Sequence, residues 1–305
     1  MKQITQADCA DVIVVAITPR NPDRTIDHDG IRGNVRHLIE HGVNVIMPEC
    51  GTGLVYDATL AEYEAVVATF IEAAGDAAFV VPGIGPGFGR SLEMGAIARS
   101  LNASGVMIMP IVGPGSPAGV LDGLGHVVET VDLPTVLYQR RADIMPADVV
   151  VSLCRMDGVV GLKYSVNDLD LFAEINDRAG EAAAMVCGMA EDPCVDYLKA
   201  GAVGFSSGMA NFVPRLSLEL LRFFKAGEVS EAECIRNEMV PFEDFRGENG
   251  ARYSASALHA AMNVSGLAGG PVIPFAEDVA EEDLPRVEGM LGRLREVEEG
   301  LFAST

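Results

Sequence analysis

The chain contains 305 residues, of which 49 % are hydrophobic and 22 % are charged, a composition typical of soluble globular proteins. Its 44 acidic and 22 basic residues give a formal net charge of −22. This charge argues against nucleic acid or an anionic membrane surface as a partner, because both attract basic patches. No apolar run reaches the roughly 18 residues of a transmembrane helix. We therefore expect a protein that acts on a small molecule.

The predicted elements alternate between short apolar strands and amphipathic helices. Helices are expected over residues 60–74, 91–101 and 168–178, among others. Strands that alternate with helices in this way pair in parallel through right-handed crossovers, and eight such units form a (β/α)8 TIM barrel. The eight expected strands cover residues 12–18, 44–48, 79–84, 105–110, 135–138, 159–163, 184–188 and 203–207.

From about residue 211 onward the pattern is helical only. Breaks at Gly227 and at the glycine-containing segments 247–250 and 269–271 separate the helices. The first helix would complete the barrel, and the other three would form a C-terminal extension. We therefore predict a barrel domain over residues 1–226 and a three-helix extension over residues 227–305. The four expected helices cover residues 214–226, 231–245, 252–265 and 284–301.

Lys163 ends a predicted strand whose consecutive apolar residues indicate burial on both faces. Reactive groups of β/α barrels lie at the carboxyl ends of the strands, so Lys163 is expected at the barrel mouth. Desolvation there favours the neutral amine, a nucleophile that forms a Schiff base with a carbonyl substrate. The alternative is a lysine that marks the strand end and points into solvent. Tyr138 ends the preceding strand and is expected beside Lys163 as a proton-transfer group, or else as a cap of the barrel core.

The loop after the second strand and the residues after Tyr138 are suited to bind an acid. Gly51, Thr52 and Gly53 offer backbone amides and one hydroxyl to a carboxylate, although such residues also form ordinary tight turns. Arg140 offers a guanidinium fork that binds a carboxylate at two points, unless it is a solvated surface arginine. Both groups are predicted to bind substrate.

The eighth strand ends in Ser206 and Ser207, with Asn211 close behind. Their polar side chains could hold hydroxyl groups of a substrate, or could cap the following helix. The two roles are compatible, and all three residues are predicted to bind substrate.

Other motifs argue against a bound cofactor, and none is predicted. Residues 83–89 are rich in glycine, but they lack the Gly-x-Gly-x-x-Gly spacing and Pro86 removes an amide donor. His37, Glu40 and His41 do not form a His-Glu-x-x-His motif. The six cysteines contain no Cys-x-x-Cys pair, and the first residues lack the apolar core of a signal peptide. We therefore expect a cytoplasmic protein without a metal site.

These residues resemble the dihydrodipicolinate synthase / N-acetylneuraminate lyase family of class I aldolases over nearly the whole chain. The resemblance implies a barrel with a C-terminal helical extension, assembled as a homodimer or homotetramer. It also implies that Lys163 forms an imine with a 2-oxo acid, assisted by Tyr138. The residues that carry it are Gly51-Thr52-Gly53, Leu137-Tyr138, Gly161-Leu162-Lys163 and the segment 201–207.

Within that family the chain is most similar to the 5-dehydro-4-deoxyglucarate dehydratase branch. This likeness implies a lyase that removes water and carbon dioxide from a sugar diacid. It further implies that Thr52 holds the carboxylate beside the imine, while Arg140, Ser206 and Asn211 hold the distal groups. The matching segments are Tyr138-Gln139-Arg140, Ser206-Ser207, Asn211-Phe212 with Pro214, and the tail segments 239–242, 246 and 269–272.

Four positions depart from the family pattern. Leu54 stands where the family has a glutamate, and Tyr164 stands where the residue is commonly acidic. Ile111 and Val112 stand where many relatives have a tyrosine, and Asp143 stands where the synthase branch has an arginine. The last two departures argue against dihydrodipicolinate synthesis. Two other functions stay open: a pyruvate-dependent aldolase or dihydrodipicolinate synthase-like enzyme, and a keto-acid-binding barrel without catalysis.

Overall fold

The parallel strands of the computed structural model, which describes residues 1–302, form one curved sheet. The strand order is β3-β2-β1-β9-β8-β7-β6-β5-β4, and every pairing is parallel. The strands are β1 (Val12–Val15), β2 (Val45–Met47), β3 (Phe79–Val80), β4 (Gly83–Ile84), β5 (Val106–Ile108), β6 (Thr135–Gln139), β7 (Val159–Tyr164), β8 (Ala184–Cys187) and β9 (Gly204–Ser207).

The two strands at the ends of this order, β3 and β4, are successive parts of the single strand predicted at residues 79–84. They are separated at Val81 and Pro82, and proline has no N–H to donate to a neighbouring strand. On one side the Val81 amide donates to Ile46 O at 2.9 Å, and on the other the Met107 amide donates to Pro82 O at 2.9 Å. The segment therefore joins both neighbours and closes the ring, which confirms the predicted barrel.

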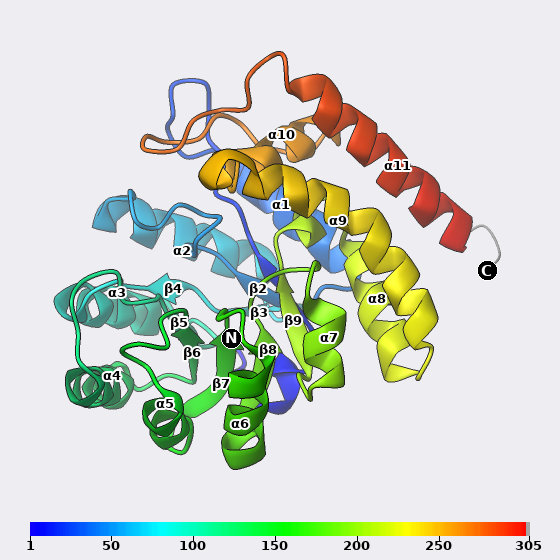
Figure 1. Cartoon of the computed structure of the whole chain (residues 1–305). Helices are drawn as coiled ribbons and strands as arrows, with labels where there is room; N and C mark the ends of the chain where they lie inside the picture. The colour runs from blue at the N-terminus through cyan, green and yellow to red at the C-terminus, as the bar shows by residue number, and fades with distance from the viewer. Residues whose placement is uncertain (303–305) are drawn as a thin grey trace.

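Helices surround this ring, as Figure 1 shows. The predicted helix at 60–74 is α2, which begins with a capping box between Thr59 and Glu62. Short 3₁₀ helices are η1 (Ala7–Cys9) and η2 (Met209–Asn211). The barrel helices are α1 (His28–Glu40), α2 (Leu60–Ala74), α3 (Phe88–Ser100), α4 (Pro117–Val131), α5 (Ala147–Cys154), α6 (Leu169–Ala179), α7 (Cys194–Lys199) and α8 (Pro214–Lys225).

Three further helices, α9 (Val229–Ala251), α10 (Ser256–Val264) and α11 (Leu284–Phe302), lie together on one side of the barrel (Figure 1). Helix α9 packs against α7 and α8, and α11 packs against α9 and α10. The backbone leaves helical geometry at residues 248–250, near the end of α9. None of the helices formed by residues 1–302 is both long enough and apolar enough to cross a bilayer.

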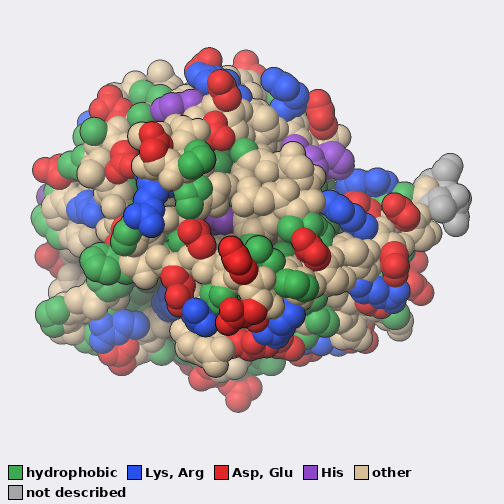
Figure 2. Space-filling model, turned by 90° about the horizontal axis from the view of Figure 1, so that it is seen from above, with side chains coloured by type: hydrophobic (Ala, Val, Ile, Leu, Met, Phe, Trp, Pro, Cys, Tyr) green, Lys and Arg blue, Asp and Glu red, His purple; other side chains and the backbone are tan. Residues whose placement is uncertain are grey.

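The barrel strands supply the core. Every residue of β1, β2, β8 and β9 is buried, as expected for parallel strands that are covered on both faces. On the face of the molecule seen in Figure 2, acidic side chains are spread widely, with basic ones interspersed among them.

Candidate active site

Lys163 lies on β7 near its carboxyl end, and the register of β6 with β7 places Tyr138 directly beside it. Lys163 Nζ is 3.7 Å from the centroid of the Tyr138 ring and donates a hydrogen bond to Gly188 O at 3.0 Å. Only 6 % of Lys163 is exposed, and no carboxylate of residues 1–302 forms an ion pair with it. The amine is therefore held inside the barrel mouth without an acidic partner.

Gly188, at the end of β8, makes room for this arrangement. Its carbonyl also accepts a hydrogen bond from Ser165 Oγ at 2.9 Å. A Cβ at position 188 would collide with Ser165 Oγ and would lie 2.7 Å from Lys163 Cγ. Only glycine therefore fits between the lysine stem and the serine.

The surroundings of Tyr138 change its acidity. Burial acts to raise the pKa of its phenol, but the charge of Lys163, hydrogen bonding from Lys163 and Ser165, and the charge of Arg140 together outweigh burial and lower the pKa. A phenol that loses its proton more readily beside an amine is suited to carry protons during imine chemistry.

A cavity of about 790 Å³ opens above these two side chains. The strand ends of the barrel line one part of it and the C-terminal extension lines the rest. The polar lining residues from the barrel are Thr52, Tyr56, Tyr138, Arg140, Lys163, Ser165 and Ser206, and those from the extension are Glu243, Arg246, Arg252, Ser254 and Glu277.

The loop of Gly51, Thr52 and Gly53 reaches the cavity with its first two residues. Nothing lies within 4 Å of a Cβ built at Gly51, whereas one at Gly53 would lie 3.1 Å from Glu49 N. Thr52 Oγ1 donates to Val15 O at 2.8 Å. Gly51 and Thr52 thus face the ligand space, and Gly53 allows the loop to pack closely on the barrel.

The three polar residues after β9 divide between the cavity and the core. Ser206 lines the cavity. Ser207 is fully buried and donates to Glu191 Oε1. Asn211 donates to Val15 O at 2.9 Å and to Gly208 O at 2.7 Å, and accepts from Ile17 N at 3.2 Å. In this structure Ser207 and Asn211 therefore make hydrogen bonds within the protein interior, and neither residue lines the cavity.

Arg140 lines the cavity, is exposed, and has no hydrogen-bond or ion-pair partner in the described part of the chain. Its neighbour Arg141 instead pairs with Asp143 at 2.6 Å. Arg252, another cavity cation, pairs with Glu277 at 2.6 Å. Arg140 is thus the cavity arginine whose guanidinium remains available to an anionic ligand.

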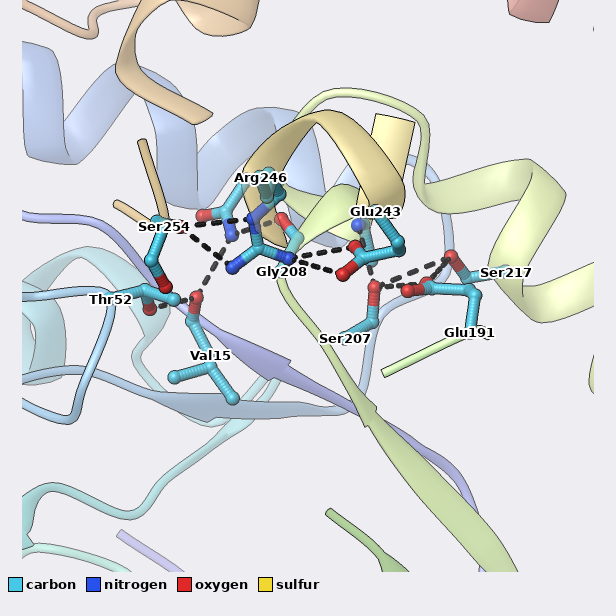
Figure 3. Close-up of polar contacts among 11 residues, drawn as sticks. Val15, Thr52, Glu191, Ser207, Gly208, Ser217, Glu243, Arg246 and Ser254 are labelled. Carbon is cyan, nitrogen blue, oxygen red and sulfur yellow. Dashed lines mark hydrogen bonds and ion pairs between the residues drawn. The ribbon is translucent and has the colours of Figure 1, made fainter. Parts of the chain in front are cut away.

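The extension contributes Arg246, which Figure 3 shows above the Thr52 loop. Its Nη1 donates to both carboxylate oxygens of Glu243 at 2.7 and 2.8 Å, while Nε and Nη2 donate to Ser254 O at 2.9 and 2.8 Å. The side chains of this ion pair are only 11 % and 13 % exposed. The extension therefore fixes its own arginine at the cavity wall.

Beside this pair, Figure 3 shows Glu191, which belongs to the loop between β8 and α7. Oε1 accepts hydrogen bonds from Ser207 and, at 2.7 Å, from Ser217, while Oε2 has no partner among the residues described. Burial, assisted by the charge of Glu243, raises the pKa of Glu191 to about 7, although the two serines and Arg246 act to lower it. This carboxyl changes charge near neutral pH while fully buried.

A second buried carboxyl, Glu49, precedes the Gly51–Gly53 loop. Burial raises its pKa to about 7, against a lowering by the hydrogen bond from Thr18 at 2.9 Å and by the charge of Arg20. Its Oε2 has no partner within residues 1–302. Glu49 is therefore part of the floor beneath the loop and not of the cavity lining.

Tyr164, one of the departures from the family pattern, has a structural position. Its ring is buried and packs edge-on against Phe172, with ring centroids 5.1 Å apart. Its hydroxyl donates to Asp168 O at 2.6 Å. It therefore anchors the start of α6 and leaves the cavity to Lys163.

Sequence reasoning did not predict Tyr56 or the cavity residues of the extension as site residues, and it named Arg246 only as part of the family likeness. Tyr56 lies beyond the glycine loop on a segment without helix or strand, and Arg246 is more than 80 residues from Lys163. No short-range pattern places either residue at the mouth. The described residues also contain no group of three or more His, Cys, Asp or Glu side chains arranged to hold a metal ion.

A buried lysine beside a tyrosine, at the carboxyl ends of the strands of a parallel barrel, has the groups that a class I lyase uses to form a Schiff base with a 2-oxo acid. The comparison with protein families agrees. The model of the dihydrodipicolinate synthetase family matches residues 8–292, and the chain belongs to this family.

Two named relatives show which members of the family the chain is similar to. The chain is 27 % identical over 287 residues to a probable 5-dehydro-4-deoxyglucarate dehydratase of Ralstonia nicotianae, covering 92 % of each protein. It is 28 % identical over 287 residues to a probable 5-dehydro-4-deoxyglucarate dehydratase of Streptomyces coelicolor, covering 91 % of this chain and 90 % of that one. Among solved structures, dihydrodipicolinate synthase from Oceanobacillus iheyensis superposes with a TM-score of 0.91 at 29 % identity, covering 95 % of this chain and 98 % of that one.

Proposed function

We propose that this lyase converts 5-dehydro-4-deoxyglucarate, a 2-oxo diacid, by loss of water and carbon dioxide. One observation carries the proposal: a single cavity presents the nearly buried amine of Lys163 and the guanidinium of Arg140, which has no partner among residues 1–302. These two groups suit a ligand with a 2-oxo group at one end and a carboxylate at the other. The relatives reported above are named probable dehydratases of this compound, which supports the same substrate here.

The first chemical step joins the substrate to Lys163. The amine attacks the 2-oxo carbon, and the resulting carbinolamine loses its hydroxyl as water with a proton from Tyr138. This leaves a protonated imine beside the Tyr138 phenolate. In this proposal Gly51 and Thr52 bind the adjacent carboxylate and Ser206 binds a substrate hydroxyl; all three residues line the cavity, which supports these roles.

The imine then serves as an electron sink for the next two bonds. With the carbons counted from the carboxylate beside the oxo group, so that the oxo carbon is C2, removal of a proton from C3 gives an enamine. Its electron pair expels the hydroxyl on C4 and leaves a C3–C4 double bond. The distal carboxylate next leaves as carbon dioxide, and its electron pair passes through that double bond to the imine nitrogen. Arg140 fixes the distal end of the diacid. Protonation and hydrolysis release the product and restore Lys163.

The test combines adduct trapping with product analysis. The protein is incubated with 5-dehydro-4-deoxyglucarate, carbon dioxide release is followed, and a parallel sample is reduced with borohydride and mapped by mass spectrometry. We expect carbon dioxide release and an adduct on Lys163, with both lost in Lys163→Ala. Release of pyruvate would instead assign an aldolase. Binding of 2-oxo acids without adduct or turnover would assign a keto-acid-binding barrel.

We further propose that the protein acts in the cytoplasm as a homodimer or homotetramer. Six free cysteines, five of them buried, suit a reducing compartment, and the likeness to a family of oligomeric enzymes supports self-association. Light scattering coupled to gel filtration measures the subunit number, and a monomer over the working concentration range would contradict the proposal.

A further inference from the structure

A second phenol shares the cavity with Tyr138. Tyr56 lies in the loop between β2 and α2, and it lines the same cavity as Tyr138, Arg140 and Lys163. Its ring is half-buried against the core, while its hydroxyl has no hydrogen-bond partner in the part of the chain that the structure describes. This phenol lines the ligand cavity, and its hydroxyl makes no hydrogen bond to the described residues. It can therefore donate a hydrogen bond or a proton to a ligand.

The two phenols experience opposite environments. Burial raises the pKa of Tyr56 to about 12, the neighbouring Tyr138 raises it further, and Arg140 acts to lower it. The pKa of Tyr138, in contrast, is lowered. Because both Tyr138 and Arg140 act on this pKa, Tyr56 lies near both side chains in the cavity. When the environments of two neighbouring titratable groups move their pKa values apart, one group acts as the acid and the other as the base.

Other donors at the cavity are already engaged or are weaker acids. The Thr52 hydroxyl donates to Val15 O, and the Ser165 hydroxyl donates to Gly188 O. Lys163 is itself in the imine during elimination, and the alcohol of Ser206 is a far weaker acid than a phenol. Tyr56 is therefore the remaining neutral donor with a free hydroxyl and phenolic acidity.

We propose that Tyr56 is the general acid that protonates the departing C4 hydroxyl of the imine-bound substrate. This inference rests on the proposed dehydration. The Tyr138 phenolate left by imine formation takes the C3 proton and becomes a phenol. The enamine electron pair forms the C3–C4 bond as the C4–O bond breaks, and Tyr56 gives its proton to the leaving oxygen, which departs as water. Proton transfer from Tyr138 to the Tyr56 phenolate restores Tyr56, so the net loss is one water.

The test is Tyr56→Phe, which removes one hydroxyl without breaking a hydrogen bond within the protein. We expect dehydration of 5-dehydro-4-deoxyglucarate to slow by about 10²–10⁴-fold, the usual contribution of a general acid. Borohydride trapping of pyruvate on Lys163 should stay at the wild-type level. Exchange of the pyruvate methyl protons in D₂O, followed by NMR, should also continue, because this exchange needs Lys163 and Tyr138 only.

A substrate with a better leaving group separates proton donation from simple disturbance of the site. Chloride leaves 4-chloro-2-oxobutanoate without a proton, so Tyr56→Phe should release chloride at a rate near that of the wild type. Tyr63→Phe is the matched control, because the Tyr63 hydroxyl also lacks a partner in the described part of the chain but is buried in α2, outside the cavity lining. This control should dehydrate the diacid normally.

Each outcome has a distinct meaning. Unchanged dehydration in Tyr56→Phe, or loss of trapping, proton exchange and chloride release together, would overturn the role of Tyr56 while leaving the proposed function intact. A wild-type protein that traps pyruvate but does not dehydrate the diacid would overturn the proposed function, and the Tyr56 assignment with it.

Discussion

Replacing Glu191 by Gln isolates the titration of one fully buried carboxyl. Its pKa is raised from 4.5 to about 7, chiefly by burial. Between these two values the folded protein keeps a proton that the unfolded chain has released, so folding is favoured at low pH. The stabilising effect is complete below about pH 4.5 and is lost as pH rises through 7. A shift of about 2.5 units corresponds to roughly 3 kcal/mol of unfolding free energy.

Urea unfolding followed by circular dichroism at pH 4.5 and pH 8 measures this quantity. The unfolding free energy of the wild type should fall by about 3 kcal/mol more over this interval than that of Glu191→Gln. The amide keeps an oxygen to accept from Ser207 and Ser217, so the variant retains those bonds. Glu281→Gln, on the exposed surface, is the matched control and should follow the wild type. Equal pH dependence in Glu191→Gln and wild type would refute the reasoning.

Two further substitutions test the site. Arg140→Ala removes the proposed partner of the distal carboxylate, and a charged hydrogen bond of about 2 kcal/mol corresponds to a roughly 30-fold rise in KM for the diacid, with pyruvate trapping unchanged; an unaltered KM would place that carboxylate elsewhere. Gly188→Ala forces a methyl against Ser165 and Lys163, so we expect a loss of about 1–3 kcal/mol in urea unfolding and slower trapping. Gly89→Ala, with nothing within 4 Å, should show neither effect.

Much of the barrel can be predicted from the local pattern of apolar and polar residues in the sequence. Alternating apolar strands and amphipathic helices predict parallel pairing, and the neighbouring positions of β6 and β7 then place Tyr138 beside Lys163. The interruption between β3 and β4 also has a local cause, since Pro82 lacks an N–H. These features depend on chain order and strand-end position, which the sequence contains directly.

The roles at the end of β9 show what such reasoning misses. Successive residues of a strand point to opposite sides, so Ser206 and Ser207 cannot both face one cavity. The sequence does not say which one does, because this depends on how the strand meets Glu191 and Ser217 from distant segments. In the structure, Ser206 lines the cavity, and Ser207 donates a hydrogen bond to the buried carboxyl of Glu191.

Residues joined only by long-range packing are beyond prediction from local pattern. Arg246 reaches the mouth because α9 folds back over the barrel beside α8. Its position is fixed by Glu243 one turn earlier and by the backbone of Ser254 after the irregular end of α9. Each of these contacts depends on the chain path of the extension and not on a motif.

The net charge of the protein affects how a doubly charged acid can bind in the cavity. At a net charge of −22, a doubly charged acid is repelled at long range, and its binding must come from groups within a Debye length of about 8 Å at physiological salt. The carboxylates that line the cavity are each paired with an arginine, so they leave no uncompensated negative charge there. Among residues 1–302, the basic groups of the cavity that have no acidic partner are the Lys163 amine and the Arg140 guanidinium. In the proposed function, they bind an acid that carries a reactive carbonyl at one end and a second carboxylate at the other.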